Sequence, residues 1–323
     1  MTTAMPVLPS EPIEPAEPDG KPGGRPRTAA NAARDLLSSR FASAATIVIA
    51  LLWTLPTFGL FVTSFRSQSD INDSGWWTAF TSPSFTLDNY RTVFSKSEAD
   101  LGQYLVNTIV ITVPSVLIPI TLAVLAAYAF AWMEFRGRDT LFVAVFALQI
   151  VPIQVTMIPL LRLYVHPLLG LPQLAGRDAP GGGFYTIWLS HTIFALPLAI
   201  FLLHNFMREI PGELIESARV DGAGHVQIFT RIMLPLMTPA IAAFGIFQFL
   251  WVWNDLLVAL VFAGGSTEIS PLTYWLGSLA GQRGEDWYLL SAGAFVSLIV
   301  PLVVFLSLQR YFVRGLLAGS VKG

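Results

Sequence analysis

The chain has no cysteine and few charged side chains. Without cysteine it can form no disulfide, thiol nucleophile or Cys-based metal site. Its four histidines show no HxxxH or HExxH spacing, so we expect no metal site and no catalytic residue. Charged residues make up 12% of its 323 residues, against about 25% in an ordinary soluble domain. The GAG stretch at Gly222–Gly224 lacks a preceding strand and is not a P-loop.

Hydrophobic residues make up 54% of the chain, and they are grouped in long runs. Crossing a bilayer as a helix takes roughly 20 apolar residues. Six stretches meet this requirement: Phe41–Phe65, Leu105–Met133, Leu141–Leu161, Phe184–Met207, Thr238–Phe262 and Leu289–Phe312. We therefore predict an all-α, multi-pass protein of the cell membrane with six transmembrane helices.

Basic residues orient these spans, because Lys and Arg are enriched in cytoplasmic loops. With the N-terminus inside, most of the 19 Lys and Arg residues lie on the cytoplasmic side. The basic residues predicted to lie outside are Arg66, Arg91, Lys96, Arg162, Arg177 and Arg283. Both termini are therefore predicted to be cytoplasmic. The first apolar run is longer than the roughly 7–15 residues of a cleaved signal peptide, so it should stay in the membrane.

The spans divide the chain into three predicted parts. Residues 1–40 are rich in proline and should form a disordered cytoplasmic tail. Residues 41–313 form the transmembrane domain, with an outer segment at 66–104 and a cytoplasmic loop at 208–237. Residues 314–323 form a cytoplasmic C-terminal tail. Aromatic residues of the outer segment are expected at the headgroup level or in a small packed cap, the alternative being a substrate-docking surface.

The loop at 208–237 is too charged to enter lipid, since each charge at the bilayer centre costs about 3 kcal/mol. Pro211 suits the first turn of a short helix, and Glu213 favours its positive end. Leu214, Ile215 and Ala218 share one face of this helix. Asp221–Gly222 and Gly224 break it, and a second short helix follows, which Pro235 ends or kinks into the next span.

Two interpretations of this helix–turn–helix remain open from its composition. In the first it is a hairpin packed only against its own bundle. In the second it is a docking element for a soluble partner.

The same stretch resembles the EAA loop of permease subunits of binding-protein-dependent ABC importers. The residues that match this pattern are Glu216, Ser217, Ala218, Asp221, Gly222, Ala223, Phe229, Ile232, Leu234 and Pro235. Ser217 replaces the usual Ala, a change between small residues. The resemblance implies the type I permease fold of such importers.

Other segments are similar to the carbohydrate branch of these permeases. They are SFRSQSDI at Ser64–Ile71, FTLDNYRTVF at Phe85–Phe94, FQFLWVWNDLLVALVF at Phe247–Phe262 and the tail at Gln309–Gly323. Within that branch the chain most resembles the second permease of maltose-type and α-glucoside transporters, with a preference for the α-glucoside type.

This resemblance implies a non-catalytic sugar permease with several partners. They are a second permease, two copies of a cytosolic ATPase, an external sugar-binding protein, the sugar and the lipid bilayer, with no nucleic acid among them. The partner ATPase would use the ATP, and this chain would bind no cofactor. Glu216 would pair with a basic residue of the ATPase, Gly222 would permit the turn, and Asp221 could accept hydrogen bonds from backbone amides. The C-terminal tail would reach the ATPase interface or lie at the headgroups.

Trp253, Asn254 and Asp255 stand within the fifth predicted span. Intramembrane carboxylates suggest a functional site, and aromatic side chains beside polar ones suit a sugar. Helix packing is the alternative, which we prefer for these residues and for His191. Asp255 also leaves open an ion-coupled secondary transporter. An intramembrane enzyme is disfavoured by the absence of Cys and of paired metal ligands.

Overall fold

The computed structural model describes residues 29–95, 100–166, 173–175, 183–263, 266–280 and 286–318, with side chains described from residue 40 to residue 309. The chain divides into two compact units, Met1–Pro56 and Thr57–Gly323. Among the described residues there is no strand, only one isolated bridge between Arg66 and Phe85. The predicted all-α class is thereby confirmed.

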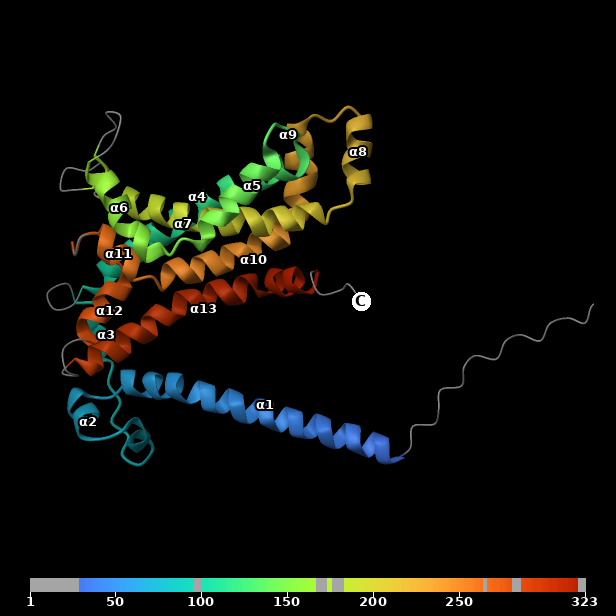
Figure 1. The fold of residues 1–323 in the computed structure, drawn as a ribbon. Coiled ribbons are helices and arrows are strands. Elements are labelled where there is room, and N and C mark those ends of the chain that lie inside the picture. Colours follow the sequence, from blue (N-terminus) through green and yellow to red (C-terminus); the bar gives the residue numbers. More distant parts are fainter. Residues whose placement is uncertain are drawn as a thin grey trace, which may run out of the picture. The chain divides into compact units, whose positions relative to one another are not determined.

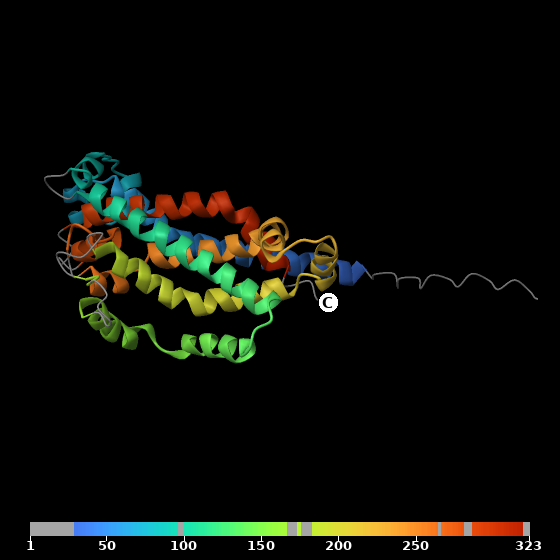
Figure 2. The same cartoon turned by 90° about the horizontal axis from the view of Figure 1, so that it is seen from above.

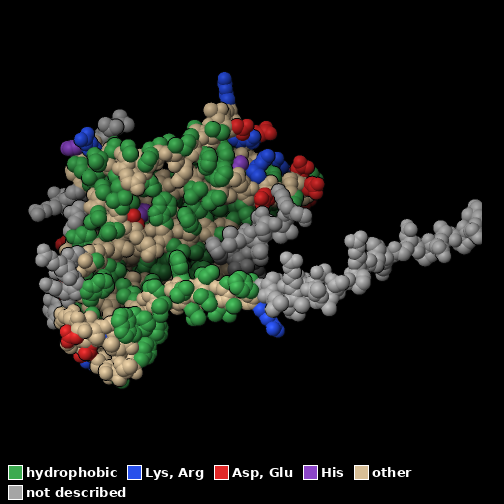
Figure 3. All heavy atoms as spheres, turned by 60° about the horizontal axis from the view of Figure 1, so that its bottom comes forward, with side chains coloured by type: hydrophobic (Ala, Val, Ile, Leu, Met, Phe, Trp, Pro, Cys, Tyr) green, Lys and Arg blue, Asp and Glu red, His purple; other side chains and the backbone are tan. Residues whose placement is uncertain are grey.

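Four long helices form the centre of the second unit. They are α4 (Leu101–Trp132), α7 (Phe184–Arg208), α10 (Leu234–Trp253) and α13 (Trp287–Ala318). Helix α4 packs along α7 and α10, and α10 packs along α13, so the four lie side by side (Figures 1 and 2). Pro114, Pro119 and Pro301 lie inside these helices, where neighbouring membrane helices tolerate them. Hydrophobic side chains cover the flank shown in Figure 3.

Helix α1 (Ala29–Ser64) contains the first predicted span. It starts before the predicted boundary and includes residues 29–40, which the sequence had assigned to the tail. Alanine is the strongest helix former, and four of the first five residues after Thr28 are alanine. The rest of the predicted tail, residues 1–28, lies outside the described residues.

The third predicted span is not one straight helix. Helix α5 (Arg138–Ala147) and the 3-10 turn η2 (Leu148–Ile150) are followed by α6 (Ile153–Val165), at an angle of 103°. Pro152 is the physical reason, because proline restricts the preceding residue to extended backbone. Val151 accordingly has φ −75° and ψ 120°. Five described helices are long and apolar enough to cross a membrane, and six segments are if the bent pair counts as one.

The fifth predicted span is also broken. Helix α10 ends at Trp253, and α11 (Leu257–Phe262) begins after Asn254–Leu256. Asn254 and Asp255 therefore do not lie inside a continuous helix, as the sequence had suggested. Asp255 accepts hydrogen bonds from the backbone N–H groups of Val258 and Ala259 at 3.3 and 3.2 Å, so it caps the new helix.

The outer segment folds into a small cap around a buried arginine. It contains α2 (Gln68–Asp73), η1 (Trp76–Phe80) and α3 (Asp88–Val93). The Arg66 guanidinium donates to the carbonyl oxygens of Asp70 and Ser74 and to the hydroxyl oxygens of Ser74 and Thr78. Hydrogen bonds from Ser84 and Ser67 lower the pKa of the Asp70 carboxyl. These bonds give the cap a fixed shape without a large apolar core.

Helix α12 (Leu272–Ala280) lies against α13, where Trp275 covers Gly293. A Cβ at Gly293 would lie 2.3 Å from Cζ3 of Trp275, whereas one at Gly277 would meet only Leu256 at 3.7 Å. We expect Gly293→Ala to destabilise the chain by about 1–3 kcal/mol through overpacking.

Gly277→Ala is the matched control, because alanine gains up to about 1 kcal/mol over glycine in a helix. Thermal melting of the purified protein in detergent measures both. Equal melting midpoints for the two variants would contradict the packing of Trp275 on Gly293.

Candidate functional site

The candidate site is the loop at the end of the bundle opposite α2, α3 and α12 (Figure 1). Its first helix, α8 (Gly212–Val220), ends in two hydrogen bonds typical of a glycine-terminated helix. The N–H of Gly222 donates to the Arg219 carbonyl at 3.0 Å, and that of Ala223 donates to the Ala218 carbonyl at 2.9 Å. Gly222 has φ +84°, a conformation that favours glycine. The predicted turn is confirmed.

One face of α8 packs on the bundle. Ile215 is 1% exposed and belongs to the core that contains Leu203 and Met207 of α7. Ala218 and Ala223 pack against the same core. Leu214 is 41% exposed, so its predicted place on the buried face was wrong. A helix of this length has only a narrow buried stripe, and Ile215 occupies its centre.

The second helix is continuous with α10. Helix α9 (His225–Ile228) passes through a π-helical segment, η4 (Phe229–Met233), into α10 without a break, so Pro235 neither ends it nor separates it from the span. The wide turn has a physical reason, because the ring of Pro235 would clash with a carbonyl four residues earlier. The N–H of Leu234 donates to the Phe229 carbonyl, five residues back.

The other residues of the matched pattern divide between core and surface. Phe229, Ile232 and Leu234 are partly buried against the core, whereas Pro235 is exposed. Ser217 is exposed and donates to the Leu214 carbonyl at 3.0 Å, which explains why serine is accepted there.

The opposite face of α8 is exposed. Glu216 forms no hydrogen bond or ion pair with any residue that the structure describes, and Asp221 accepts no backbone hydrogen bond there. Val220 is 88% exposed and Val226, on the next helix, is 76% exposed. Beside the turn lies a hollow of about 450 Å³, whose walls include Asp221, Gly222 and Arg231. The exposed surface of the loop thus combines charged and apolar side chains, and the hollow lies beside its turn.

Two polar contacts fix the loop to the end of α4. The Tyr128 hydroxyl lies 3.0 Å from Nδ1 of His225, and its ring makes an edge contact with Phe229. The Arg219 guanidinium donates to the Trp132 carbonyl at 3.4 Å. No local pattern in the sequence predicts these pairs, because about 90 residues separate the two members of each.

Trp253, Asn254 and Asp255 lie at the other end of α10. Trp253 is 3% exposed and donates through Nε1 to the Ser297 carbonyl at 3.2 Å. The Asn254 amide donates to the Leu250 carbonyl at 2.7 Å. Asp255 caps α11, and its Oδ2 lies 3.7 Å from Nε2 of the buried His191. These contacts favour the helix-packing interpretation of the three side chains.

Most of the C-terminal tail lies outside the described residues, so its two predicted roles stay predictions. Helix α13 extends to Ala318, and residues 319–323 lie outside the described residues, as do the side chains of 310–318. In the described part of the chain, no group of three or more His, Asp or Glu residues could hold a metal ion.

The chain is similar to several membrane components of uptake systems. It is 52% identical to the osmoprotective compounds uptake permease protein GgtD of Synechocystis sp., over 86% of this chain and 90% of that protein. It is also 52% identical to the α-glucoside transport system permease protein AglG of Rhizobium meliloti, over 77% of this chain and 63% of that protein.

Solved structures share the fold. A bacterial ABC transporter involved in the import of the acidic polysaccharide alginate contains a chain that aligns with a TM-score of 0.64 and 20% identity, covering 86% of this chain and 98% of that one. Residues 119–317 match the family described as the binding-protein-dependent transport system inner membrane component. This range contains the whole helix–turn–helix. The chain therefore belongs to that family, and it is a multi-pass inner-membrane component of a binding-protein-dependent transport system.

Proposed function

We propose that the chain is a permease subunit of an ATP-driven sugar importer, and that α8 and the turn after it dock on a cytosolic ATPase. One observation carries the docking proposal: α8 is anchored to the bundle by one face and exposes the other. Ile215 and Ala218 fix the helix, while Glu216 and Val220 face away from the core. A hairpin that packed only on its own bundle would not need an exposed valine, Val220, next to an unpaired carboxylate, Glu216.

The contacts of the loop suit transmission of a force. A docked partner that moves α8 pulls on α4 through Tyr128 and Arg219, and on α10 through the continuous helix from His225. Rigid-body movement of packed helices is a common form of conformational switching. We infer that closure of two ATPase subunits changes the side of the membrane to which the pathway opens. A second permease and an external binding protein complete this assembly.

Sugars are the proposed substrates, of the α-glucoside or maltodextrin type. The similarity to AglG supports this class. The melibiose/raffinose/stachyose import permease protein MelC of Bacillus subtilis, 31% identical over 88% of this chain, supports a carbohydrate more generally. GgtD is named for the uptake of osmoprotective compounds, and the similarity to it makes those compounds the competing class.

Uptake of labelled solutes tests the substrate. We expect cells that make the complete transporter to take up an α-glucoside or a maltodextrin, and to lose that uptake when ATP is depleted. Uptake of osmoprotective compounds alone would contradict the sugar assignment. Uptake that persists without ATP and follows an ion gradient would contradict the importer and favour the secondary transporter.

A further inference from the structure

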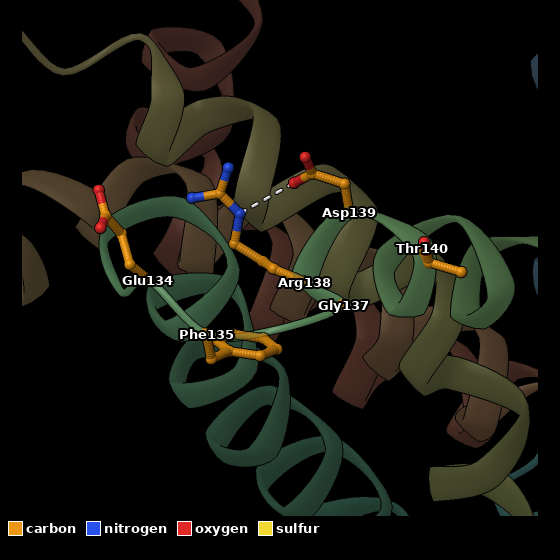
Figure 4. Close-up of a pocket in the computed structure, with 6 residues that line it drawn as sticks. All are labelled: Glu134, Phe135, Gly137, Arg138, Asp139 and Thr140. Carbon is orange, nitrogen blue, oxygen red and sulfur yellow. Dashed lines mark hydrogen bonds and ion pairs between the residues drawn. The ribbon is translucent and has the colours of Figure 1, made fainter.

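A basic pocket lies between α4, α5 and α7, away from the loop described above. Its volume is about 300 Å³, and its walls come from Phe130 at the end of α4, from the first turns of α5, and from His204 and Arg208 at the end of α7. Arg138 and Asp139 line both this pocket and a second hollow of about 360 Å³ beside it (Figure 4). None of these residues belongs to the matched EAA pattern.

Two guanidinium groups at this pocket have N–H donors without an acceptor among the described residues. Nε of Arg138 donates to Oδ1 of Asp139 at 2.9 Å, and no described residue accepts a hydrogen bond from either Nη atom. Figure 4 marks only the Nε contact. Arg208 is exposed and forms no hydrogen bond with a described residue. The pocket thus has two arginines against one carboxylate, and that carboxylate is 86% exposed to solvent.

The floor of the pocket is aromatic and continues into an apolar surface. The Phe142 ring lies 4.3 Å from the His204 ring and 5.5 Å from the Phe130 ring, measured between centroids. From the pocket, α5 continues beside α7, with Val143 63% exposed and Phe146 39% exposed. The exposed side chains of Val143 and Phe146 form an apolar track beside the basic pocket. Such a combination matches a molecule with an anionic headgroup and hydrocarbon chains.

We propose that this pocket binds the headgroup of an anionic phospholipid of the cytoplasmic leaflet. The phosphate accepts hydrogen bonds from Arg138 and Arg208, since arginine is suited to phosphate recognition. The acyl chains lie along Val143 and Phe146. Basic pockets between membrane helices on the cytoplasmic side bind acidic headgroups in other proteins. An acidic protein would use the arginines but not the apolar track, which favours the lipid.

The test uses the full chain, extracted in mild detergent with the subunits that accompany it. Native mass spectrometry measures retention of added phosphatidylglycerol and of phosphatidylcholine. We expect preference for phosphatidylglycerol, weakened about fivefold by Arg138→Gln or by Arg208→Gln, and about 25-fold by both together. Arg136→Gln is the matched control, because Arg136 is an exposed arginine of the same loop that does not line the pocket.

Several outcomes would overturn the proposal. Equal weakening by Arg136→Gln would mean general attraction of basic residues to acidic lipid. No preference between the two lipids, with saturable binding of inorganic phosphate, would mean a free anion site. Loss of a co-purifying protein from the double variant, with lipid retention unchanged, would mean a protein interface. Arg138→Lys with Arg208→Lys guards against misfolding, since the two lysines should restore most of the lipid preference.

Discussion

Gly222→Val is expected to lower solute uptake by at least about tenfold while the protein still reaches the membrane. Gly222 has φ +84°, and its N–H completes the end of α8. A β-branched side chain in this conformation costs on the order of 1–3 kcal/mol, and each 1.4 kcal/mol is a factor of ten in an equilibrium. The turn would open to relieve the strain, and α8 would lose its fixed direction. Under the proposed function, a displaced α8 cannot dock.

The control for this prediction is Gly224→Val. Gly224 lies two residues further on, has φ −78°, and has open space where a Cβ would lie. The two variants add the same side chain to the same turn, so only the backbone conformation distinguishes them. Uptake and ATP hydrolysis are measured together, because uncoupling lowers the first without the second. Normal solute uptake by the Gly222→Val variant would contradict the proposed role of the turn.

Glu216→Lys is expected to weaken the association with the ATPase by more than about 100-fold. The carboxylate is exposed at the middle of α8 and has no partner among the described residues. Reversing its charge against a basic residue of a partner costs several kcal/mol through like-charge repulsion. The fold should be unaffected, because Glu216 contributes nothing to the core that holds Ile215.

Glu209→Lys provides the matched charge reversal. Glu209 is also exposed, but it caps the end of α7 and does not lie on α8. Co-purification of the ATPase with each variant, measured at several salt concentrations, separates a local contact from a general charge effect. Equal loss of ATPase co-purification in the two variants would show that only the overall charge of this end of the protein matters. It would contradict a specific contact of Glu216.

Local chemistry made much of the loop predictable. Proline, glycine and the charge pattern act on their immediate neighbours, so Gly222 predicted the end of α8, and Pro211 predicted its start to within one residue, since α8 begins at Gly212. The burial of Ile215 followed from helical spacing, because neighbouring positions on one face meet the same surface. The same spacing misplaced Leu214, since the width of the buried stripe depends on the helix beneath it.

Contacts between distant segments were not predictable. Asn254 and Asp255 lie in an apolar run, and only the structure shows that the helix breaks there and that Asp255 caps α11 next to His191. The bend of 103° at the third span had a local sign in Pro152, but Pro114 and Pro119 stay inside α4. A proline alone does not distinguish a break from a tolerated position, because the packing of neighbours decides it.

The most direct test of the central claim is a cross-link from α8. The natural chain has no cysteine, so Val220→Cys introduces a single thiol at a position that is 88% exposed. Thr81→Cys, in the exposed outer cap, is the control. We predict that a thiol-to-amine reagent in native membranes joins position 220, and not position 81, to an ATPase with a P-loop. A chain that cross-links to no ATPase, purifies alone and moves solute under an ion gradient would contradict the account.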